Sequence, residues 1–405
     1  MKNVLISGAS IAGPALGYWL QRYGFRVTIV ERAPALRPGG YAVDVRGAGL
    51  DVLKRMDLSD AARRENTDTL ATSFVDENGK RAATMDRGFG VADANDVEIM
   101  RGDLARILYE ATREHVTYVF SDAISALEES ADGVRVSFSV RPAETFDMVI
   151  GADGVHSHVR RLAFGDEAQF MHTLGSYMAI FSAPNHLELD RWQLIYNQPG
   201  RVVSIKTARG NAIVTVAAFF SSAPLTYDYR DLEQQKRLTA AAYADAGWEL
   251  PRLLSAMQQA PDFYFDSTCQ IRMPRWSQGR VTLVGDACCC PSPLSGQGTG
   301  LALVGSYVLA GELANAAGDH TTAFANYERV MRPFAERNQA GAEGIAKGFA
   351  PQTPREIRRR NFALKVMNFL PGKDFMFKMA ARAAAESAKS ITLSDYRAAS
   401  ASGSR

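Results

Sequence analysis

The pattern of residues 3–31 limits what this chain can fold into more than any other feature. An apolar run at 3–7 leads into a turn with Gly8 and Gly13, a helical pattern follows at 15–23, and a second apolar run ends at Glu31. This order is typical of a β-α-β unit whose glycine turn lets a phosphate approach the N-terminus of the helix. A carboxylate at the end of the second strand can accept hydrogen bonds from ribose hydroxyls. The segment therefore predicts a dinucleotide site, and Glu31 favours FAD or NAD over NADP.

One position departs from the full glycine fingerprint, because Ser10 stands where a middle glycine is expected. Serine still permits a close approach of the backbone, but it adds a side chain. An ordinary β-α-β unit with a glycine-rich turn is therefore the alternative. The strand before the turn, the helix after it and the acid that ends the next strand favour dinucleotide binding.

Two further glycine-containing segments lie far along the chain. Residues 151–160 contain Asp153-Gly154, and Gly285-Asp286 leads into an apolar helical pattern at 300–314 through a turn that contains Pro293, Gly296, Gly298 and Thr299. A helix that begins at such a turn presents its N-terminus to an anion. The N-terminal turn would then hold a diphosphate, and the later turn would hold the ribityl chain and ring edge of a flavin.

Composition excludes several classes of protein. The 405 residues carry a formal net charge of +2 at pH 7, so we expect no nucleic-acid partner. Every apolar run is shorter than a transmembrane helix requires, and Met1-Lys2 leads directly into an apolar run without room for a signal peptide. We therefore expect a cytoplasmic protein without stable membrane association, present as a monomer or weak dimer.

The cysteines and histidines do not form a recognisable metal site. Cys269 and the run Cys288-Cys289-Cys290 lack the CxxC spacing of metal clamps, so we expect a structural or incidental role in a reducing compartment. His156 and His158 have a spacing that metal ligands on a strand could have. Inside the 151–160 motif they more often flank a cofactor loop or face solvent, so no metal is predicted.

The order of the patterns predicts four parts of the chain. Asn78-Gly79 is typical of a hairpin turn, and Arg355, Arg358, Arg359 and Arg360 are typical of a solvated helix face. The predicted parts are a discontinuous cofactor domain (1–70, 98–169 and 275–360), a mostly antiparallel substrate domain (71–97 and 170–274), a C-terminal helical segment (361–397) and a flexible tail (398–405).

Together, the glycine turn, the Asp153-Gly154 motif with Ser157 and Arg160 downstream, and Gly285-Asp286 resemble the class A flavoprotein monooxygenases of the p-hydroxybenzoate hydroxylase fold. The resemblance covers roughly residues 1–350. The motif around Arg101 and the C-terminal helix look most similar to the tetracycline-inactivating flavin monooxygenases and to natural-product hydroxylases. The resemblance implies an α/β fold, with a Rossmann-like three-layer FAD-binding domain, an inserted mostly antiparallel β-sheet substrate domain and a C-terminal helix.

The resemblance also assigns residues to non-covalently bound FAD. Arg101, which opens a helix that contains Leu104, would contact the diphosphate or ribityl region, Asp153 would serve FAD and the reductant, and Asp286 would bind a ribityl hydroxyl. The backbone near the ring edge would be that of Pro293, Gly296, Gly298 and Thr299. The segment at the pyrophosphate, ribose and adenine would comprise Gly8, Ser10, Ile11, Ala12, Gly13, Glu31 and Arg32.

Two more positions match the tetracycline-inactivating group. Arg37 resembles an arginine assigned to the reduced nicotinamide cofactor, and Asp44 resembles an aspartate near the flavin. The alternatives are a loop salt bridge for Arg37 and a surface or turn carboxylate for Asp44. Cys288-Cys289-Cys290 stands where many relatives have a histidine after the GD aspartate.

The activity that the resemblance implies is centred on the flavin, so we predict no catalytic side chain. NADPH or NADH would reduce FAD, O2 would form a C4a-hydroperoxide, and one oxygen atom would enter an aromatic or polycyclic small molecule. Arg201 and Lys206 could orient a phenolate or carboxylate, or lie at the surface. The second domain supplies aromatic residues that are core residues by default: Tyr177, Phe181, Trp192, Tyr196, Phe219, Phe220, Phe263, Tyr264 and Phe265.

Two alternatives stay open at this point. The first is an FAD-dependent reductase of the same fold. The second is a flavin protein that sequesters an aromatic ligand without turnover. The sequence does not identify the substrate, the oxygenated position or the choice between NADPH and NADH.

Overall fold

The computed structural model describes residues 1–37, 40–86, 96–208, 210–369 and 386–396. Its first sheet has six strands in the order β17-β18-β11-β1-β2-β7, parallel except for the β17–β18 pair. These strands are β1 (Asn3–Ser7), β2 (Arg26–Glu31), β7 (Thr117–Phe120), β11 (Met148–Gly151), β17 (Ser277–Gln278) and β18 (Val281–Leu283). The pairing of β1 with β2 and β11 brings the N-terminal turn beside the Asp153-Gly154 motif.

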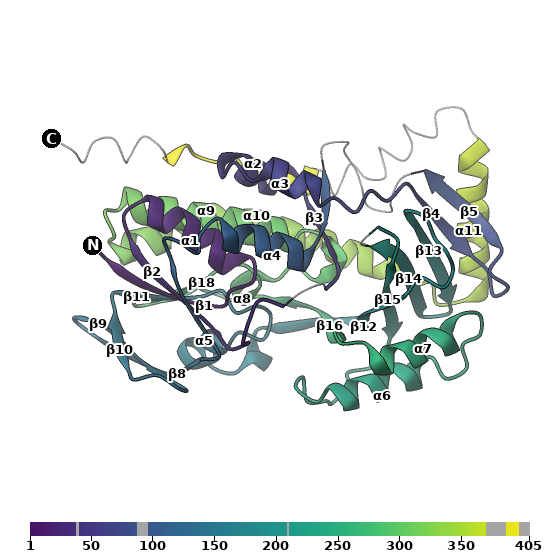
Figure 1. The fold of residues 1–405 in the computed structure, drawn as a ribbon, viewed down its shortest axis with the longest axis horizontal. Helices are drawn as coiled ribbons and strands as arrows, with labels where there is room; N and C mark the ends of the chain where they lie inside the picture. Colours follow the sequence, from purple (N-terminus) through teal and green to yellow (C-terminus); the bar gives the residue numbers. More distant parts are fainter. Residues whose placement is uncertain (38–39, 87–95, 209, 370–385, 397–405) are drawn as a thin grey trace.

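Two layers cover this sheet, and Figure 1 shows them on its opposite faces. One layer contains α1 (Ala12–Arg22), α4 (Arg101–Glu110), α9 (Gly298–Asn315) and α10 (His320–Phe349). The other contains α5 (His158–Phe164), the short helix η1 (Glu167–Gln169) and a three-stranded sheet made of β8 (Ile124–Ser130), β9 (Gly133–Phe138) and β10 (Glu144–Phe146). The fold is therefore the predicted three-layer α/β arrangement.

The helix α9 lies in the centre of the helical layer because its sequence is apolar on all sides. All its residues from Thr299 to Leu313 are buried, and its neighbours include α1, α2 and α10. A helix that is apolar all round is stable only where other elements surround it. Its N-terminus, at Gly298, lies at the end of the turn that follows β18.

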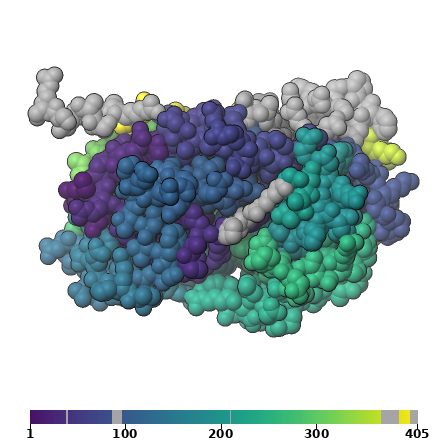
Figure 2. Space-filling model, in the orientation of Figure 1, coloured from purple at the N-terminus to yellow at the C-terminus, as the bar shows by residue number. Residues whose placement is uncertain are grey.

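The second sheet has seven strands in the order β16-β12-β15-β14-β13-β4-β5, and Figure 2 shows its teal and green residues as a lobe beside the purple and blue residues. All neighbouring pairs are antiparallel except β13–β4, as predicted for a mostly antiparallel domain. The strands are β4 (Ala71–Val75), β5 (Arg81–Asp86), β12 (Met171–Pro184), β13 (Trp192–Gln198), β14 (Arg201–Ala208), β15 (Ile213–Ser221) and β16 (Tyr264–Ile271). The predicted hairpin at Asn78-Gly79 joins β4 and β5, with Gly79 at φ 74°.

Side chains alternate between the two faces of this sheet, as the strand geometry requires. On one face, Tyr177, Phe181 and Phe220 pack with α6 (Leu232–Ala242) and α7 (Leu250–Gln259), a helix that the sequence patterns did not predict. On the other face, Met178 and Phe219 line a cavity toward the first domain. The second sheet therefore has an apolar core on one side and residues that line a cavity on the other.

Short elements connect the two sheets and cover their junction. β3 (Ala42–Val45) pairs with β6 (Val97–Met100), and the neighbouring helices are α2 (Gly47–Arg55), α3 (Ser59–Arg64) and α8 (Asp286–Cys289), with the short helix η2 (Pro293–Ser295) before α9. None of the described helices is long and apolar enough to cross a membrane.

The C-terminal region differs from the predicted helix at 361–397. α11 begins earlier, spans Pro354–Phe369 and packs against β5 and β13, while Tyr396 is buried against α9 and donates a hydrogen bond to Glu312 (2.8 Å). Residues 370–385 and the predicted tail lie outside the described residues. The arginine cluster is not fully solvated either, because Arg360 binds Asn197 and lies 4.6 Å from the ring of Phe74.

Candidate functional site

Two adjoining cavities lie between the first sheet, the helical layer and the second sheet. They have volumes of about 530 and 330 Å³, within the range of small-molecule sites. Four residues line both cavities: Ser10, Ala152, Gly154 and Arg101. The cavities are called here the first cavity, beside the N-terminal turn, and the second cavity, beside the second sheet. An elongated ligand could occupy both.

The N-terminal turn forms one wall of the first cavity through its backbone. Gly8 has φ 108° and lines the cavity, whereas Gly13 does not line it. Gly13 packs against the turn instead, and a Cβ on Gly13 would lie 1.9 Å from the carbonyl oxygen of Gly8. Gly13 therefore lets α1 approach the turn closely, and it does not border the space itself. Leu104 is also buried outside both cavities.

Glu31 lies at the end of β2 and lines the first cavity. Its two carboxylate oxygens accept hydrogen bonds from the N–H groups of Ala9 and Ala33, both at 2.9 Å. These bonds hold the carboxylate in place and leave further lone pairs for hydroxyl donors. Arg32, Arg37 and Arg101 line the same cavity and make it suitable for a diphosphate.

Asp153 lies at the turn between β11 and α5. Its carboxylate accepts hydrogen bonds from the hydroxyl of Ser157 (2.5 Å) and from the N–H groups of His158 (2.9 Å) and Val159 (3.1 Å). Burial raises the pKa of Asp153, although these hydrogen bonds oppose the shift. The Asp153 side chain therefore holds the loop that borders the first cavity, and most of its hydrogen bonds are made with residues at the start of α5.

The second cavity is bounded by the turn that follows β18. Gly285 and Gly296 have φ values of 66° and 62°, which glycine adopts without strain, and α9 begins two residues after Gly296. Pro293, Gly298 and Thr299 line the cavity with Asp286, and Ser10, Ile11 and Ala12 line it from the opposite side. Free N–H groups at the start of α9 can stabilise an anionic ring edge.

A buried atom in this wall lacks a partner among the described residues. The Oδ1 atom of Asp286 is buried without a hydrogen bond, and a Cβ on Gly298 would lie 3.5 Å from it. Burial raises the pKa of Asp286, and the charge of Arg101 opposes that shift. A ribityl hydroxyl donated to Oδ1 would satisfy this atom, so the residues present fit a flavin that extends from one cavity into the other.

Asp44 also lines the second cavity, from the strand β3. Its Oδ2 accepts a hydrogen bond from Arg46 (2.7 Å), and it faces Glu98 in the β3–β6 pair. Burial raises the pKa of Asp44 to about 6, because the opposing charge of Arg46 only partly compensates and Glu98 adds repulsion. Asp44 is therefore a titratable group in the cavity wall, and the alternative interpretation of Asp44 as a surface carboxylate is wrong.

The second sheet supplies a wall that no sequence motif indicated. Thr72, Gln193, Lys206 and Thr215 form a row across adjacent strands, and all but Thr72 line the second cavity. Lys206 forms an ion pair with Glu98, whereas Arg201 pairs with Asp245, which is largely exposed. Next to this row lie apolar cavity residues: Met178, Ile180, Ala217 and Phe219.

Most of the aromatic residues singled out in the second domain are core residues. Only Phe219 and Tyr264 of that set line the second cavity, and Tyr41, Asp266 and Ser204 were missed. Ser204 and Asp266 lie in strands, where alternation does not say which face meets a ligand, and Tyr41 lies just before β3.

The cysteines lie behind and beside the second cavity. Cys269 and Cys290 line it, whereas Cys288 and Cys289 are buried in the core. Burial raises the pKa of Cys269 to about 12 and the pKa of Cys290 well above its ordinary value, so both remain neutral thiols. No cluster of potential metal ligands occurs within the described residues.

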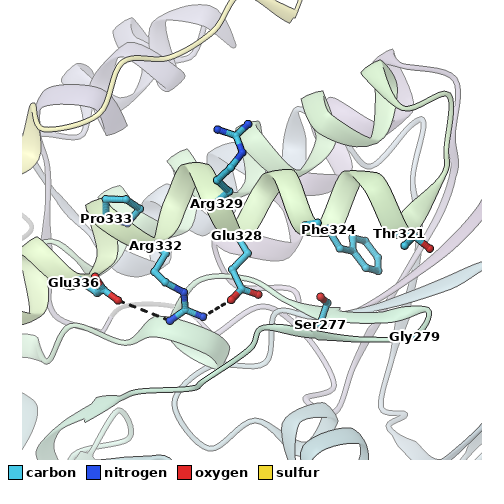
Figure 3. Close-up of a pocket in the computed structure, with 10 residues that line it drawn as sticks. Ser277, Gly279, Thr321, Phe324, Glu328, Arg329, Arg332, Pro333 and Glu336 are labelled. Carbon is cyan, nitrogen blue, oxygen red and sulfur yellow. Dashed lines mark hydrogen bonds and ion pairs between the residues drawn. The ribbon is translucent and has the colours of Figure 1, made fainter.

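A third hollow, of about 620 Å³, lies between α10 and the segment that contains Ser277 and Gly279 (Figure 3). Arg332 lies there between Glu328 and Glu336 and forms ion pairs with both, and Ser277 and Gly279 form the opposite side. It contains none of the predicted cofactor residues. The two adjoining cavities are therefore the candidate site.

Known proteins share this arrangement. The family described as FAD binding domain matches residues 1–342. The uncharacterized protein Rv1260 of Mycobacterium tuberculosis is 47% identical over 372 residues, which cover 91% of this chain and all of that protein. A flavin-dependent monooxygenase of Legionella longbeachae is 40% identical over 350 residues, covering 86% of this chain and 89% of the relative.

Among solved structures, tetracycline destructase Tet(51) superimposes with a TM-score of 0.86 at 33% identity, covering 98% of this chain and 100% of that chain. The family match includes the N-terminal turn, the Asp153-Gly154 motif, Gly285-Asp286 and the strands of both large sheets. The chain belongs to the FAD binding domain family and is a flavin-dependent monooxygenase within it.

Proposed function

We propose that this monooxygenase uses NADPH or NADH and O2 to insert one oxygen atom into an aromatic or polycyclic small molecule. The observation that carries the proposal is the pair of adjoining cavities with the unpartnered Oδ1 atom of Asp286 in the second one. Bound FAD would pass the electrons of the nicotinamide to O2 at the second cavity. We also propose the two-domain division at residues 1–70, 98–169 and 275–360 against 71–97 and 170–274.

The protein groups would divide the work of holding the cofactor. Glu31 would accept hydrogen bonds from ribose hydroxyls, and Arg101 would contact the diphosphate or ribityl region. In the same cavity, Arg32 would flank the adenine and Arg37 would contact the reduced nicotinamide cofactor. Asp286 would accept a hydrogen bond from the ribityl chain, and the N-terminus of α9 would stabilise negative charge at the ring. None of these groups needs to act as a nucleophile.

The second sheet would position the substrate and exclude water. Met178, Ile180, Ala217 and Phe219 offer an apolar face for a planar ring, and Gln193, Ser204 and Lys206 offer polar contacts at one end. This combination suits a polycyclic compound that carries oxygen substituents on one edge. The likeness to a tetracycline destructase makes a tetracycline the first compound to test.

The test has two steps. Purified protein should bind about one FAD per chain, which absorbance and fluorescence of the released cofactor would measure. With FAD bound, tetracycline and a panel of phenolic polycycles should be tested for stimulated NADPH or NADH consumption under 18O2, and products should be analysed by mass spectrometry. A product with one labelled oxygen atom supports the proposal.

Other outcomes contradict it in distinguishable ways. Label from water or an oxygen-independent reduction would indicate a reductase of the same fold. Tight binding of a ligand without nicotinamide consumption would indicate a sequestering protein. Failure to bind FAD at all would contradict the whole assignment of the two cavities.

A further inference from the structure

His156, one of the two histidines in the Asp153-Gly154 motif, lies between two carboxylates. Its Nδ1 is 2.8 Å from Oε1 of Glu167, and its Nε2 is 3.1 Å from Oδ2 of Asp266. The ring stacks on Tyr229 with a centroid distance of 4.8 Å. A histidine can bond two carboxylates in this way only when both ring nitrogens carry hydrogen, which is the charged form.

Asp266 connects this histidine to the second cavity. The Asp266 side chain is only 3% exposed, and its Oδ2 also accepts a hydrogen bond from the hydroxyl of Tyr264 (2.9 Å). Asp266 and Tyr264 line the second cavity, whereas His156 lines the first. Oδ1 of Asp266 accepts from the N–H of Ser267 (2.7 Å), and the hydroxyl of Tyr227 lies 3.5 Å from it.

Glu167 connects the histidine to solvent. Its side chain is 27% exposed, and its second oxygen, Oε2, accepts a hydrogen bond from the fully buried Arg160 (2.6 Å). Arg160 in turn donates to the carbonyl oxygens of Ala287 and Val155. Four groups, Tyr264, Asp266, His156 and Glu167, therefore form an unbroken hydrogen-bonded chain from the cavity wall to the surface.

The charges around His156 favour its charged form. Burial is the largest influence and lowers the pKa of His156, but the hydrogen bonds and charges of Asp266 and Glu167 outweigh it and raise the pKa to about 10. The aromatic ring of Tyr229 covers the remaining face. A proton is thus held at the midpoint of the chain at neutral pH.

We propose that Tyr264, Asp266, His156 and Glu167 form the path by which a proton from solvent reaches the second cavity during turnover. This inference rests on the proposed function. Oxygenation consumes NADPH, one proton, O2 and substrate, and yields NADP⁺, oxygenated substrate and water. The oxygen atom that leaves as water must receive protons inside a cavity that excludes bulk water.

Two of the transfers use existing hydrogen bonds, the one from Nε2 of His156 to Asp266 and the one between Asp266 and Tyr264. The Tyr264 hydroxyl first turns from Asp266 toward the acceptor in the cavity and gives up its proton there, and His156 then passes its Nε2 proton through Oδ2 of Asp266 to the Tyr264 oxygen. Nδ1 keeps its own hydrogen, so the imidazole ring must turn before a proton from water at the exposed side of Glu167 can replace the one lost from Nε2. The path ends with the charges with which it began, and one proton has moved from solvent to the cavity.

The charge on His156 can be tested on the full chain without FAD. The chain contains six histidines, so isotope-labelled histidine gives few NMR signals, and His156→Gln identifies the relevant one. We expect the His156 ring to be charged at pH 8 in the wild type and neutral in Asp266→Asn. His186→Gln is the matched control, because His186 also bonds a carboxylate (Glu249, 2.7 Å) but lies outside both cavities. Titration of His156 at its ordinary value would overturn the proposal.

Proton delivery is tested by reoxidation of the FAD-loaded protein. The enzyme is reduced with NADPH without oxygen and then mixed with oxygenated, weakly buffered water that contains a pH indicator. One proton should disappear per flavin reoxidised. Asp266→Asn and Tyr264→Phe should slow this step about 10²-fold, the lower end of the effect of a positioned proton donor, and should alter its solvent isotope effect. His186→Gln should react like the wild type.

The two variants make the result decisive. If Asp266→Asn does not fold, Tyr264→Phe, which removes a single hydroxyl, decides alone. Variants that retain FAD and reoxidise at the wild-type rate with an unchanged isotope effect would overturn the path but leave the proposed function intact. A wild-type protein that binds no FAD would overturn the proposed function, and the path with it.

Discussion

The two walls of the second cavity are built in different ways. On the side of the first sheet, backbone forms the wall, through turns at Gly285 and Gly296 and the start of α9. On the side of the second sheet, side chains form it, including Gln193 and Lys206 on neighbouring strands. A backbone wall tolerates few residue types at its turns, whereas a side-chain wall can change without altering the fold. The first should therefore determine which cofactor binds, and the second which substrate.

The largest expected effect comes from the packing of α1 behind the N-terminal turn, which supports the backbone side of the site. Gly13→Ala would place a Cβ 1.9 Å from the carbonyl oxygen of Gly8, so α1 and the turn must move apart. We expect the free energy of unfolding to fall by about 3 kcal/mol and FAD affinity to fall with it. Denaturant unfolding of the protein without FAD and cofactor titration would measure both.

A matched substitution separates the clash from the general effect of alanine. Gly344 lies in α10 with no atom within 4 Å of an added Cβ. Gly344→Ala should raise stability by about 0.5–1 kcal/mol, because alanine is the better helix former. If both substitutions changed the free energy of unfolding equally, the close approach of α1 to the turn at Gly13 would not contribute to stability.

The next effect concerns the carboxylate of Asp286. Asp286→Asn should weaken FAD binding by about 2 kcal/mol, because a hydrogen bond to a charged acceptor is lost. In the protein without FAD, the same substitution should raise the free energy of unfolding. Burial raises the pKa of Asp286 above its unfolded value, so ionisation destabilises the fold as pH rises through the folded pKa, and asparagine avoids that cost.

These opposite signs distinguish a cofactor ligand from a structural carboxylate. Thermal unfolding at pH 8 without FAD should show the Asp286→Asn variant to be more stable than the wild type, and fluorescence titration should show its weaker affinity for FAD. A variant that is less stable without FAD and equally able to bind it would assign Asp286 a structural role.

The difference between the walls explains what the sequence could predict. Glu31, Arg101, Asp286 and the turn before α9 lie in motifs, because a phosphate and a flavin ring require particular backbone shapes nearby. Most of these residues line the two cavities. Gly13 was expected at the pyrophosphate, but sequence spacing alone could not distinguish contact with a ligand from close packing of α1 against the turn.

The second wall could not be predicted for a physical reason. Asp266 contacts His156 although the two residues lie 110 positions apart in the sequence. Such long-range pairing leaves no local pattern. Both faces of β12 are apolar, so the sequence could not distinguish residues that face the cavity from residues that face α7.

The contact between the two domains at His156 predicts a pH-dependent effect. The folded pKa of His156 is raised to about 10, above its ordinary 6.5, so its stabilising contribution is complete below pH 6.5 and is lost as pH rises toward 10. His156→Gln should lower the free energy of unfolding by about 1.5 kcal/mol at pH 6. The difference from the wild type should disappear near pH 10.

Unfolding of the two proteins between pH 6 and 10 would measure this trend. The His186→Gln variant serves as the reference, since its histidine lies within the second domain and does not bridge to the first. A difference between wild type and His156→Gln that stays constant across the pH range would mean that packing on Tyr229, and no charge, accounts for the effect.

The smallest effect tests the side-chain wall. The Oγ1 atom of Thr215 is buried, lines the second cavity and has no hydrogen-bond partner in the part of the chain that the structure describes. Thr215→Val removes this unsatisfied hydroxyl at nearly constant shape and should raise stability by about 1 kcal/mol, while Thr215→Ser keeps the hydroxyl and should not. FAD affinity should be the same in both variants, because Thr215 belongs to the substrate wall. If Thr215→Val instead weakened FAD binding, the division between a cofactor wall and a substrate wall would be wrong. If it lowered only the turnover of an identified substrate, the hydroxyl would be the group that this substrate satisfies.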